Sequence, residues 1–397
     1  MEWPQFRGPG AHGKSADKVP TTFSDKENLL WKIEMPGPGT SSPIIAKGRV
    51  FITYYTGFNV PGQGRGSMDN LKLHVLCLNE ADGKTNWSKE VTPKLPEQES
   101  IRDGHGYASS TPATDGERVY VFFGKTGVFA FDYEGKQLWQ TDVGSQLNGW
   151  GSAASPVLYQ DWVLINASVE SESVVALDKK TGKEAWRAKG IKEAWNTPTL
   201  VAADGGKTEL VVPIIGKVFG LDPSTGKQLW SCATDIAWYM VPSVVADAGV
   251  VYCIGGRSGG ALAIRTSGRD DVTKTHRLWT GKKGSNVSSP IYHEGHLYWM
   301  HEAQGLAFCA EAKTGNIVYE KRIDRADQVY ASPVLAGGHI YYIGRNGRIY
   351  VVAAKPGFEL TATNTMNDRS MFNSSPAVAN GRLYVRSDKF LYCVGSK

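Results

Sequence analysis

The sequence predicts an all-β protein, an eight-bladed β-propeller of four-stranded antiparallel blades. Two repeated features predict this fold: a run of small residues ending in proline, and an Asp–turn–Trp element at a matching spacing. A third observation is that each end of the chain carries part of one blade. Because self-similarity at a period of about 40–45 residues is the signature of propeller blades, the repeats outweigh chain length as evidence for the fold.

The proline marker sets the period. Leaving out a long first interval, its copies are spaced by about 44 residues on average, enough for four short strands and their turns. The copies read SSP, STP, ASP, NTP, VPS, SSP, ASP and SSP, with prolines at Pro43, Pro112, Pro156, Pro198, Pro242, Pro290, Pro333 and Pro376.

Each repeat contains alternating or continuous apolar runs of strand length. After the proline come a short apolar strand, a turn such as KGR, and an alternating strand such as RVFITY at 49–54. A glycine-bearing loop then leads to a third strand such as GVFAFD at 127–132. The chain has room for one further strand before the next marker, so each repeat predicts one four-stranded blade.

The closing element of each repeat predicts a tight turn and a buried tryptophan. In LDKKTGKEAW, the Asp178 carboxylate can accept hydrogen bonds from the turn, and Gly182 supplies the positive φ that such a turn needs. Trp186 supplies a large flat surface, which we expect to be buried between neighbouring blades. Trp279 takes the same place after an insertion that reads RTSGRDDVTKTH.

The two chain ends predict how the ring closes. From Pro376 to Lys397 there is room for three strands, and LLWKIEM at 29–35 resembles the missing fourth strand. Pairing these segments would remove two exposed sheet edges at once. We therefore expect residues 1–397 to form one propeller, in which residues 29–35 complete blade 8 and residues 56–70 form an insertion in blade 1.

Composition excludes several classes of function. The chain has 44 basic and 39 acidic residues, and no Lys/Arg run long enough for a nucleic-acid patch, so no nucleic-acid partner is expected. No apolar window approaches 18 residues, so no membrane span is expected. The five cysteines include no C-x-x-C pair, so neither a zinc site nor a disulfide framework is indicated. We expect a monomer.

The small-residue/Pro starts, together with A-x-D-x-x-T-G-K-x-x-W-like endings at 176–186 and 220–230, resemble the PQQ-like propeller family over nearly the whole chain. That family includes quinoprotein alcohol dehydrogenases, which bind PQQ and calcium on the propeller axis, and the noncatalytic assembly lipoprotein BamB. The opening WPQFRGPG (3–10) is similar to the start of exported members. The resemblance therefore implies a periplasmic or secreted protein whose signal peptide has been removed.

This chain departs from the quinoprotein dehydrogenases in three ways: it is shorter, and it has neither an adjacent cysteine pair nor a CxxCH heme site. We therefore expect a binding protein more than an enzyme, with no catalytic residues, metal site or cofactor. PQQ with calcium, in a divergent quinoprotein oxidoreductase, stays open as the alternative.

The blade-to-blade loops predict the binding face. In a four-stranded meander these loops emerge on the same face as the loops between second and third strands. They carry an unusual number of aromatic side chains, with charged and histidine side chains among them. The candidate ligand-binding residues are Tyr107, Trp150, Trp195, Trp238, Tyr239, Tyr330, Phe372, His105, Arg325, Asp327 and Arg369.

A mouth lined in this way suits a ligand that stacks on rings and forms hydrogen bonds, so we expect a protein partner or a carbohydrate. Two other interpretations remain open. The aromatic side chains could serve only to plug the channel. A polysaccharide lyase or hydrolase would need an acid/base pair such as His105 with Asp327 close together.

Overall fold

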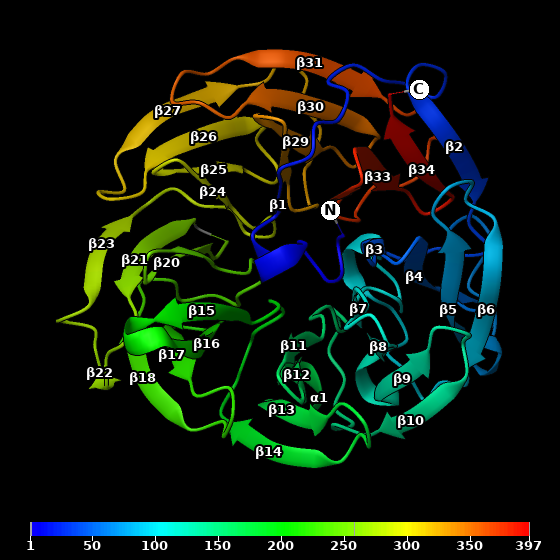
Figure 1. The fold of residues 1–397 in the computed structure, drawn as a ribbon, viewed down its shortest axis with the longest axis horizontal. Helices are drawn as coiled ribbons and strands as arrows, with labels where there is room; N and C mark the ends of the chain where they lie inside the picture. The colour runs from blue at the N-terminus through cyan, green and yellow to red at the C-terminus, as the bar shows by residue number, and fades with distance from the viewer. Residues whose placement is uncertain (1, 258, 397) are drawn as a thin grey trace.

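The computed structural model describes residues 2–257 and 259–396 and confirms the predicted eight-bladed propeller. Figure 1 shows the sheets arranged in a ring, with the first strand of a blade, such as β3, β7 or β11, toward the centre. Blades 1 to 4 consist of β3 (Ile44–Ala46), β4 (Arg49–Thr56), β5 (Lys72–Asn79) and β6 (Thr85–Val91); β7 (Ala113–Thr114), β8 (Arg118–Phe122), β9 (Val128–Asp132) and β10 (Gln137–Thr141); β11 (Val157–Tyr159), β12 (Trp162–Ala167), β13 (Ser173–Asp178) and β14 (Glu184–Lys189); β15 (Thr199–Ala203), β16 (Lys207–Ile214), β17 (Lys217–Leu221) and β18 (Gln228–Ala233).

Blades 5 to 8 repeat the same antiparallel order. They consist of β19 (Val245–Asp247), β20 (Val250–Gly255), β21 (Gly260–Arg265) and β23 (Arg277–Gly281); β24 (Ile291–His293), β25 (His296–Met300), β26 (Leu306–Glu311) and β27 (Ile317–Arg322); β28 (Val334–Ala336), β29 (His339–Ile343), β30 (Arg348–Ala353) and β31 (Leu360–Thr365); β32 (Ala377–Ala379), β33 (Arg382–Arg386), β34 (Phe390–Gly395) and β2 (Leu29–Glu34). The helical turns are η1 (Pro9–Ala11), η2 (Met68–Asn70), η3 (Arg102–Gly104), η4 (Gly124–Thr126), α1 (Ser168–Ser171) and η5 (Asp204–Gly206).

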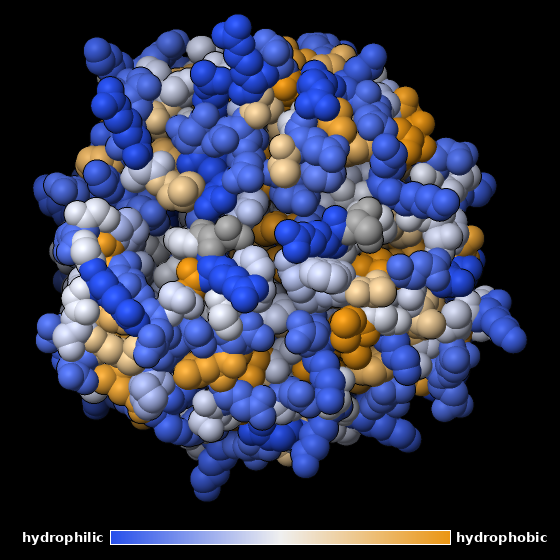
Figure 2. Space-filling view, turned by 180° about the vertical axis from the view of Figure 1, so that it is seen from behind, coloured by the Kyte–Doolittle hydropathy of each residue, from blue (hydrophilic) through white to orange (hydrophobic). Residues whose placement is uncertain are grey.

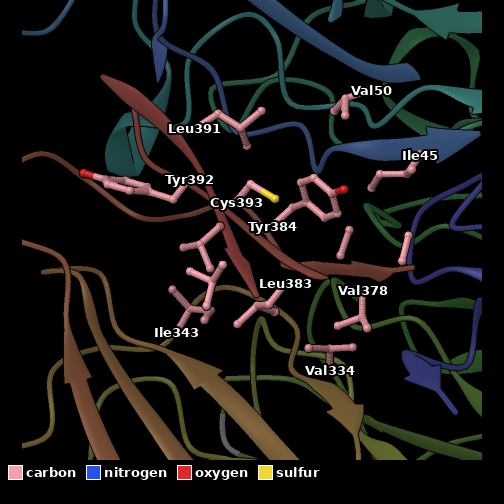
Figure 3. Packing of buried hydrophobic residues seen from close by; sticks show 14 of the residues in the cluster. Ile45, Val50, Val334, Ile343, Val378, Leu383, Tyr384, Leu391, Tyr392 and Cys393 are labelled. Carbon is pink, nitrogen blue, oxygen red and sulfur yellow. The ribbon is translucent and has the colours of Figure 1, made fainter. Parts of the chain in front are cut away.

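The N-terminal strand closes the ring as predicted. β2 pairs antiparallel with β34, and Trp31 lies opposite Cys393 in the register. The Trp31 indole N–H donates to the backbone oxygen of Glu80 at 3.0 Å, which joins blade 8 to blade 1. Figure 3 shows the core at this closure, where side chains of blade 8 pack between those of blades 7 and 1: Tyr384, Leu391 and Cys393; Val334 and Ile343; Ile45 and Val50.

The closing tryptophans dock on the turn glycine of the next blade. A Cβ added to Gly182, where φ is +71°, would lie 2.7 Å from the Trp139 ring. The Trp139 indole N–H donates to the backbone oxygen of Lys179 at 3.0 Å. The glycine is therefore required twice, by its backbone conformation and by the approach of the indole. The same close approach joins Gly83 to Trp31, Gly135 to Trp87, Gly226 to Trp186 and Gly315 to Trp279.

Trp230 is the exception, because the insertion in blade 5 changes its surroundings. Its indole N–H donates to Glu209 Oε2 at 2.7 Å within its own blade. The inserted residues form β22 (Asp270–Asp271), which pairs parallel with β18 and places Asp270 opposite Trp230. The insertion thus covers the outer edge of blade 4 that would otherwise be exposed.

A glycine substitution tests this docking. We expect Gly182→Ala to lower the free energy of unfolding by about 1–3 kcal/mol more than Gly216→Ala, because overpacking adds to the backbone strain only at Gly182. Gly216 is the matched control, since its φ is +70° and an added Cβ would have nothing within 4 Å. Urea denaturation of both variants measures the difference. Equal losses would show that the tryptophan contact does not constrain the turn.

The proline markers are explained by a belt of hydroxyl groups around the channel. From blade 1 to blade 8, the backbone N–H of each marker residue donates to the side-chain oxygen of the marker residue in the next blade, at 2.9–3.1 Å. We call this set the hydroxyl belt: Ser42, Thr111, Ser155, Thr197, Ser243, Ser289, Ser332 and Ser375.

The belt corrects one alignment of the repeats. The proline pattern places the fifth marker at Pro242. By this pattern, the residue before Pro242 should correspond to the residue before the proline in the other blades. In the structure, Ser243 is the residue that accepts the N–H of Thr197 and donates its own N–H to Ser289. The hydroxyl is kept in register because it links the blades, whereas the proline is not needed for that bond.

The N-terminal segment also crosses the ring, which the sequence patterns did not predict. Trp3 is fully buried and exchanges two backbone hydrogen bonds of 2.8 Å with Ile45 in blade 1. The buried Arg7 donates to the backbone oxygen of Ser289 in blade 6 at 3.4 Å. β1 (Lys14–Ser15) then pairs parallel with β28 in blade 7. In Figure 1 this blue segment runs across the centre of the ring; we call residues 3–13 the plug.

Candidate functional site

The plug and the hydroxyl belt enclose one end of an axial pocket with a volume of about 190 Å³. Phe6 of the plug lines the pocket together with the hydroxyl belt, which surrounds the channel. The other lining residues are Thr40, His105, Ser109, Trp150, Ala153, Trp195, Tyr239, Val241, Asn286, Val287, Tyr330 and Asn373. Figure 2 shows the face opposite that of Figure 1, where orange and pale residues lie among blue ones near the middle.

An aromatic cluster forms one wall of the pocket. The Tyr239 ring centroid lies 5.8 Å from Trp150, 5.7 Å from Trp195 and 5.6 Å from Trp238. Trp195 is buried, and its indole N–H donates to the backbone oxygen of Gly151 at 2.7 Å. Tilted and edge-to-face pairs at these distances are mutually attractive, so Tyr239 is held in place by rings from three different blade connections.

Polar groups also line the pocket. His105 Nδ1 lies 3.0 Å from Ser109 Oγ, and Tyr330 of the lining is covered by Arg345 from outside it, with the guanidinium 4.2 Å from the ring centroid. Near the aromatic wall, Asn286 Nδ2 donates to the Tyr239 hydroxyl at 3.4 Å. The pocket therefore offers both stacking surfaces and hydrogen-bonding groups.

The structure brings together His105, Trp150, Trp195, Tyr239 and Tyr330 among the predicted site residues. Trp238 stands at the edge of this group, 41% exposed, with the Arg257 guanidinium 5.9 Å from its ring centroid. It contacts Tyr239 but is not part of the lining.

Two other predicted aromatic residues, also in blade connections, lie outside the pocket lining. Phe372 is fully buried, and its ring stacks on Tyr392 at 6.2 Å. Tyr107 packs edge-on against Tyr55 at 5.3 Å and donates its hydroxyl to the backbone oxygen of Gln98 at 2.7 Å. Burial raises the pKa of the Tyr107 hydroxyl. Both rings support the loops around the pocket without lining it.

The predicted charged residues lie in loops outside the pocket lining. The Arg325 side chain is 86% exposed, next to Asp324, and Arg369 is also exposed. The backbone N–H of Asp327 donates to the Tyr350 hydroxyl at 2.9 Å. His105 lines the pocket and Asp327 does not, so this lining gives no support to the His105–Asp327 acid/base pair.

The blade 1 insertion at 56–70 connects β4 to β5. Asn59 Nδ2 donates to the backbone oxygen of Glu99 at 2.7 Å and to the Tyr107 hydroxyl at 3.1 Å. The insertion is thereby fastened to the connection between blades 1 and 2, beside the residues that support the pocket.

The sequence patterns missed Phe6, Asn286 and the hydroxyl belt. The belt was present as the small residues of the marker, which were used only to count repeats. Phe6 belongs to no repeat, and no local sequence pattern predicts that residue 6 lies in the same pocket as the loops of blades 3 to 5. Only the threading of the plug across the ring brings it there.

The carboxyl groups with the clearest shifts toward neutral pH lie outside the pocket lining. Burial, with a smaller contribution from the nearby Glu97 carboxylate, raises the pKa of Glu170 to about 7. Burial also raises the pKa of Glu97 itself. Ser152 donates its hydroxyl to Glu170 Oε1, so this carboxyl group fastens α1 to the connection between blades 2 and 3.

The donor set does not fit PQQ with calcium. Calcium takes six to eight oxygen ligands, usually including carboxylates, whereas the described lining of the pocket contains no Asp or Glu. Within the described residues there is also no group of three or more His, Cys, Asp and Glu side chains that could hold a metal ion. We therefore derive no chemical step from that pair.

The fold and the pocket define a class of protein: an eight-bladed propeller with an axial channel that is plugged at one end and aromatic-lined at the other. Residues 23–146 and 71–321 match the family model described as outer membrane protein assembly factor BamB. The chain belongs to this PQQ-like, BamB-like family. Among the described residues, no helix is long and apolar enough to cross a membrane.

Relatives and solved structures agree with this assignment. The outer membrane protein assembly factor BamB of Yersinia pestis is 25% identical over 310 residues, which cover 72% of this chain and 74% of that protein. The structure of BamB from Moraxella catarrhalis matches with a TM-score of 0.65 at 14% identity, covering 93% of this chain and 97% of that one. Quinohemoprotein alcohol dehydrogenase from Comamonas testosteroni matches with a TM-score of 0.68 at 12% identity, covering 100% of this chain and 81% of that one. At these identities the two structures show the shared fold alone.

Proposed function

We propose that this protein is a noncatalytic, exported binding propeller whose axial pocket receives a group presented by a protein partner. The observation that carries the proposal is that the aromatic wall around Tyr239 and a ring of hydroxyl groups line one pocket. Buried aromatic side chains in pockets, surrounded by polar groups, are typical of the residues that dominate binding energy. The pocket opens among loops, where binding residues are commonly found on rigid scaffolds.

Family membership supports a protein partner and a location in the cell envelope. The related protein from Yersinia pestis is named as an assembly factor for outer membrane proteins, which implies work on other proteins. A periplasmic or secreted location of this chain follows as part of the same proposal.

A glycan is the second candidate ligand, and one observation favours it. Sugar rings stack on indole and phenol rings and bond through hydroxyl groups, and the pocket offers both kinds of contact.

Substitutions in the aromatic wall test the proposal. Peptides selected from a displayed random library, and glycans on an array, are measured for binding to the wild type, Trp150→Ala and Tyr239→Ala. We expect each substitution to weaken binding of selected ligands at least tenfold, because it removes a stacking surface worth about 1.4 kcal/mol or more.

Tyr159→Ala is the matched control, since Tyr159 lies at the end of β11 and is not part of the pocket lining. Thermal melts exclude loss of folding as the cause. Ligands that bind all four proteins equally well would overturn the axial site. Selection of glycans without peptides would assign the site to carbohydrate.

A further inference from the structure

The floor of the pocket comes from the plug and not from a blade. Phe6 is the plug residue in the pocket lining, and it lies between two anchored neighbours. Trp3 on one side is fully buried and bonded to Ile45 in blade 1. Arg7 on the other side is 2% exposed and reaches Ser289 in blade 6. Phe6 is thus held from two different parts of the ring.

Arg7 is a firm anchor because backbone oxygens surround its guanidinium group. It donates to Ala11 and His12 at 3.2 Å each, within the plug itself, as well as to the blade 6 backbone. Burial lowers its pKa to about 9, which leaves the group protonated at neutral pH. Phe6 cannot be withdrawn from the pocket without breaking hydrogen bonds of Arg7. The position of Phe6, and with it the depth of the pocket, is therefore fixed.

The pocket is lined without a side chain of fixed formal charge. The lining of the described pocket contains no Asp, Glu, Lys or Arg, although such residues stand in the loops outside it. Transferring an ionised group into this lining would cost much of its hydration without a counter-charge. The lining therefore selects uncharged ligand groups.

The volume sets a limit on size. A cavity of about 150 Å³ accepts one benzene molecule, and sites that enclose drug-sized ligands have about 300–1,000 Å³. The axial pocket, at about 190 Å³, therefore has room for one substituted six-membered ring.

We propose that Phe6 is a specificity-determining residue that limits the axial pocket to a single uncharged ring at the end of a larger partner. This inference rests on the proposed function and adds the class of group that is bound. The expected group is a phenol-like side chain of a protein partner, in line with the proposed function, and a sugar ring is the alternative outcome of the test.

The test uses small probes with the full-length protein. Titration calorimetry measures binding of p-cresol, methyl β-glucoside, the two-ring 2-naphthol and the charged benzylammonium ion. We expect the wild type to bind p-cresol at least tenfold more tightly than methyl β-glucoside, 2-naphthol and benzylammonium. Preference for p-cresol supports a side chain of a protein partner, and preference for the glucoside would overturn that assignment in favour of a glycan.

Substitution of Phe6 then changes the size limit. Phe6→Ala should improve 2-naphthol binding at least tenfold and leave benzylammonium weak, whereas Phe6→Trp should weaken the single-ring probes. Phe358→Ala is the control, because Phe358 packs against Tyr319 outside the pocket lining. Unchanged probe selectivity in both folded Phe6 variants would overturn the inference.

The two proposals fail separately. If Phe6 substitutions leave selectivity unchanged while Tyr239→Ala still weakens the selected ligands, Phe6 has no role in specificity and the axial site stands. If Tyr239→Ala has no effect on the selected ligands and no ring probe binds, both proposals fall.

Discussion

A chain that lacks residues 1–35 should lose its cooperative unfolding transition. The deletion removes β2, which leaves the edge of β34 unpaired and opens the ring between blades 8 and 1. It also removes Trp31, whose ring packs 6.0 Å from Tyr384 and whose indole N–H bonds to blade 1. Propellers depend on closure for stability, so we expect folding to fail at the closing blade first.

Thermal melts followed by circular dichroism measure this effect. A variant that lacks only residues 2–13 is the informative comparison, because it loses the plug and retains β2. We expect it to keep a single transition at a lower midpoint, since it loses the buried Trp3 and Arg7. A truncated protein without residues 1–35 that melts as the wild type does would refute the closure argument.

The double variant Thr111→Val with Thr197→Val should lower the free energy of unfolding by about 2–6 kcal/mol. Valine keeps the shape of threonine but removes the hydroxyl group. It leaves the buried N–H of Ser42 without its 2.9 Å bond and the buried N–H of Ser155 without its 3.0 Å bond. An unsatisfied buried donor costs about 1–3 kcal/mol, and well-separated sites add.

Urea denaturation of the single and double variants measures these losses. Thr363→Val is the matched control, because Thr363 is exposed on β31 and valine suits a strand. We expect its effect to lie within about 0.5 kcal/mol of zero. A double variant as stable as this control would mean that the hydrogen bonds of the hydroxyl belt do not contribute to stability.

The fold was predictable because the features that repeat are the ones that hold blades together. Trp31 could be paired with the strand of Cys393 from sequence, since it keeps the distance to its marker proline that other closing tryptophans keep. The proline pattern gives the wrong register for the fifth repeat, because it follows Pro242, whereas Ser243 makes the hydrogen bond.

The site was predictable only in part. The aromatic residues of the loops include Tyr239 and Trp150, which pack in a tilted pair at the pocket, and also Phe372, which is fully buried. Loop sequences do not show which way a ring turns, because that depends on neighbouring blades. Phe6 was beyond reach, since its position follows from a long-range crossing of the ring.

The plug makes the propeller a cup and not a tube. A group held above Phe6 must leave through the mouth by which it entered, so release requires the whole partner to withdraw from the loop face. The face that carries Arg7 and β1 lies at the closed end of the pocket and takes no part in that exchange.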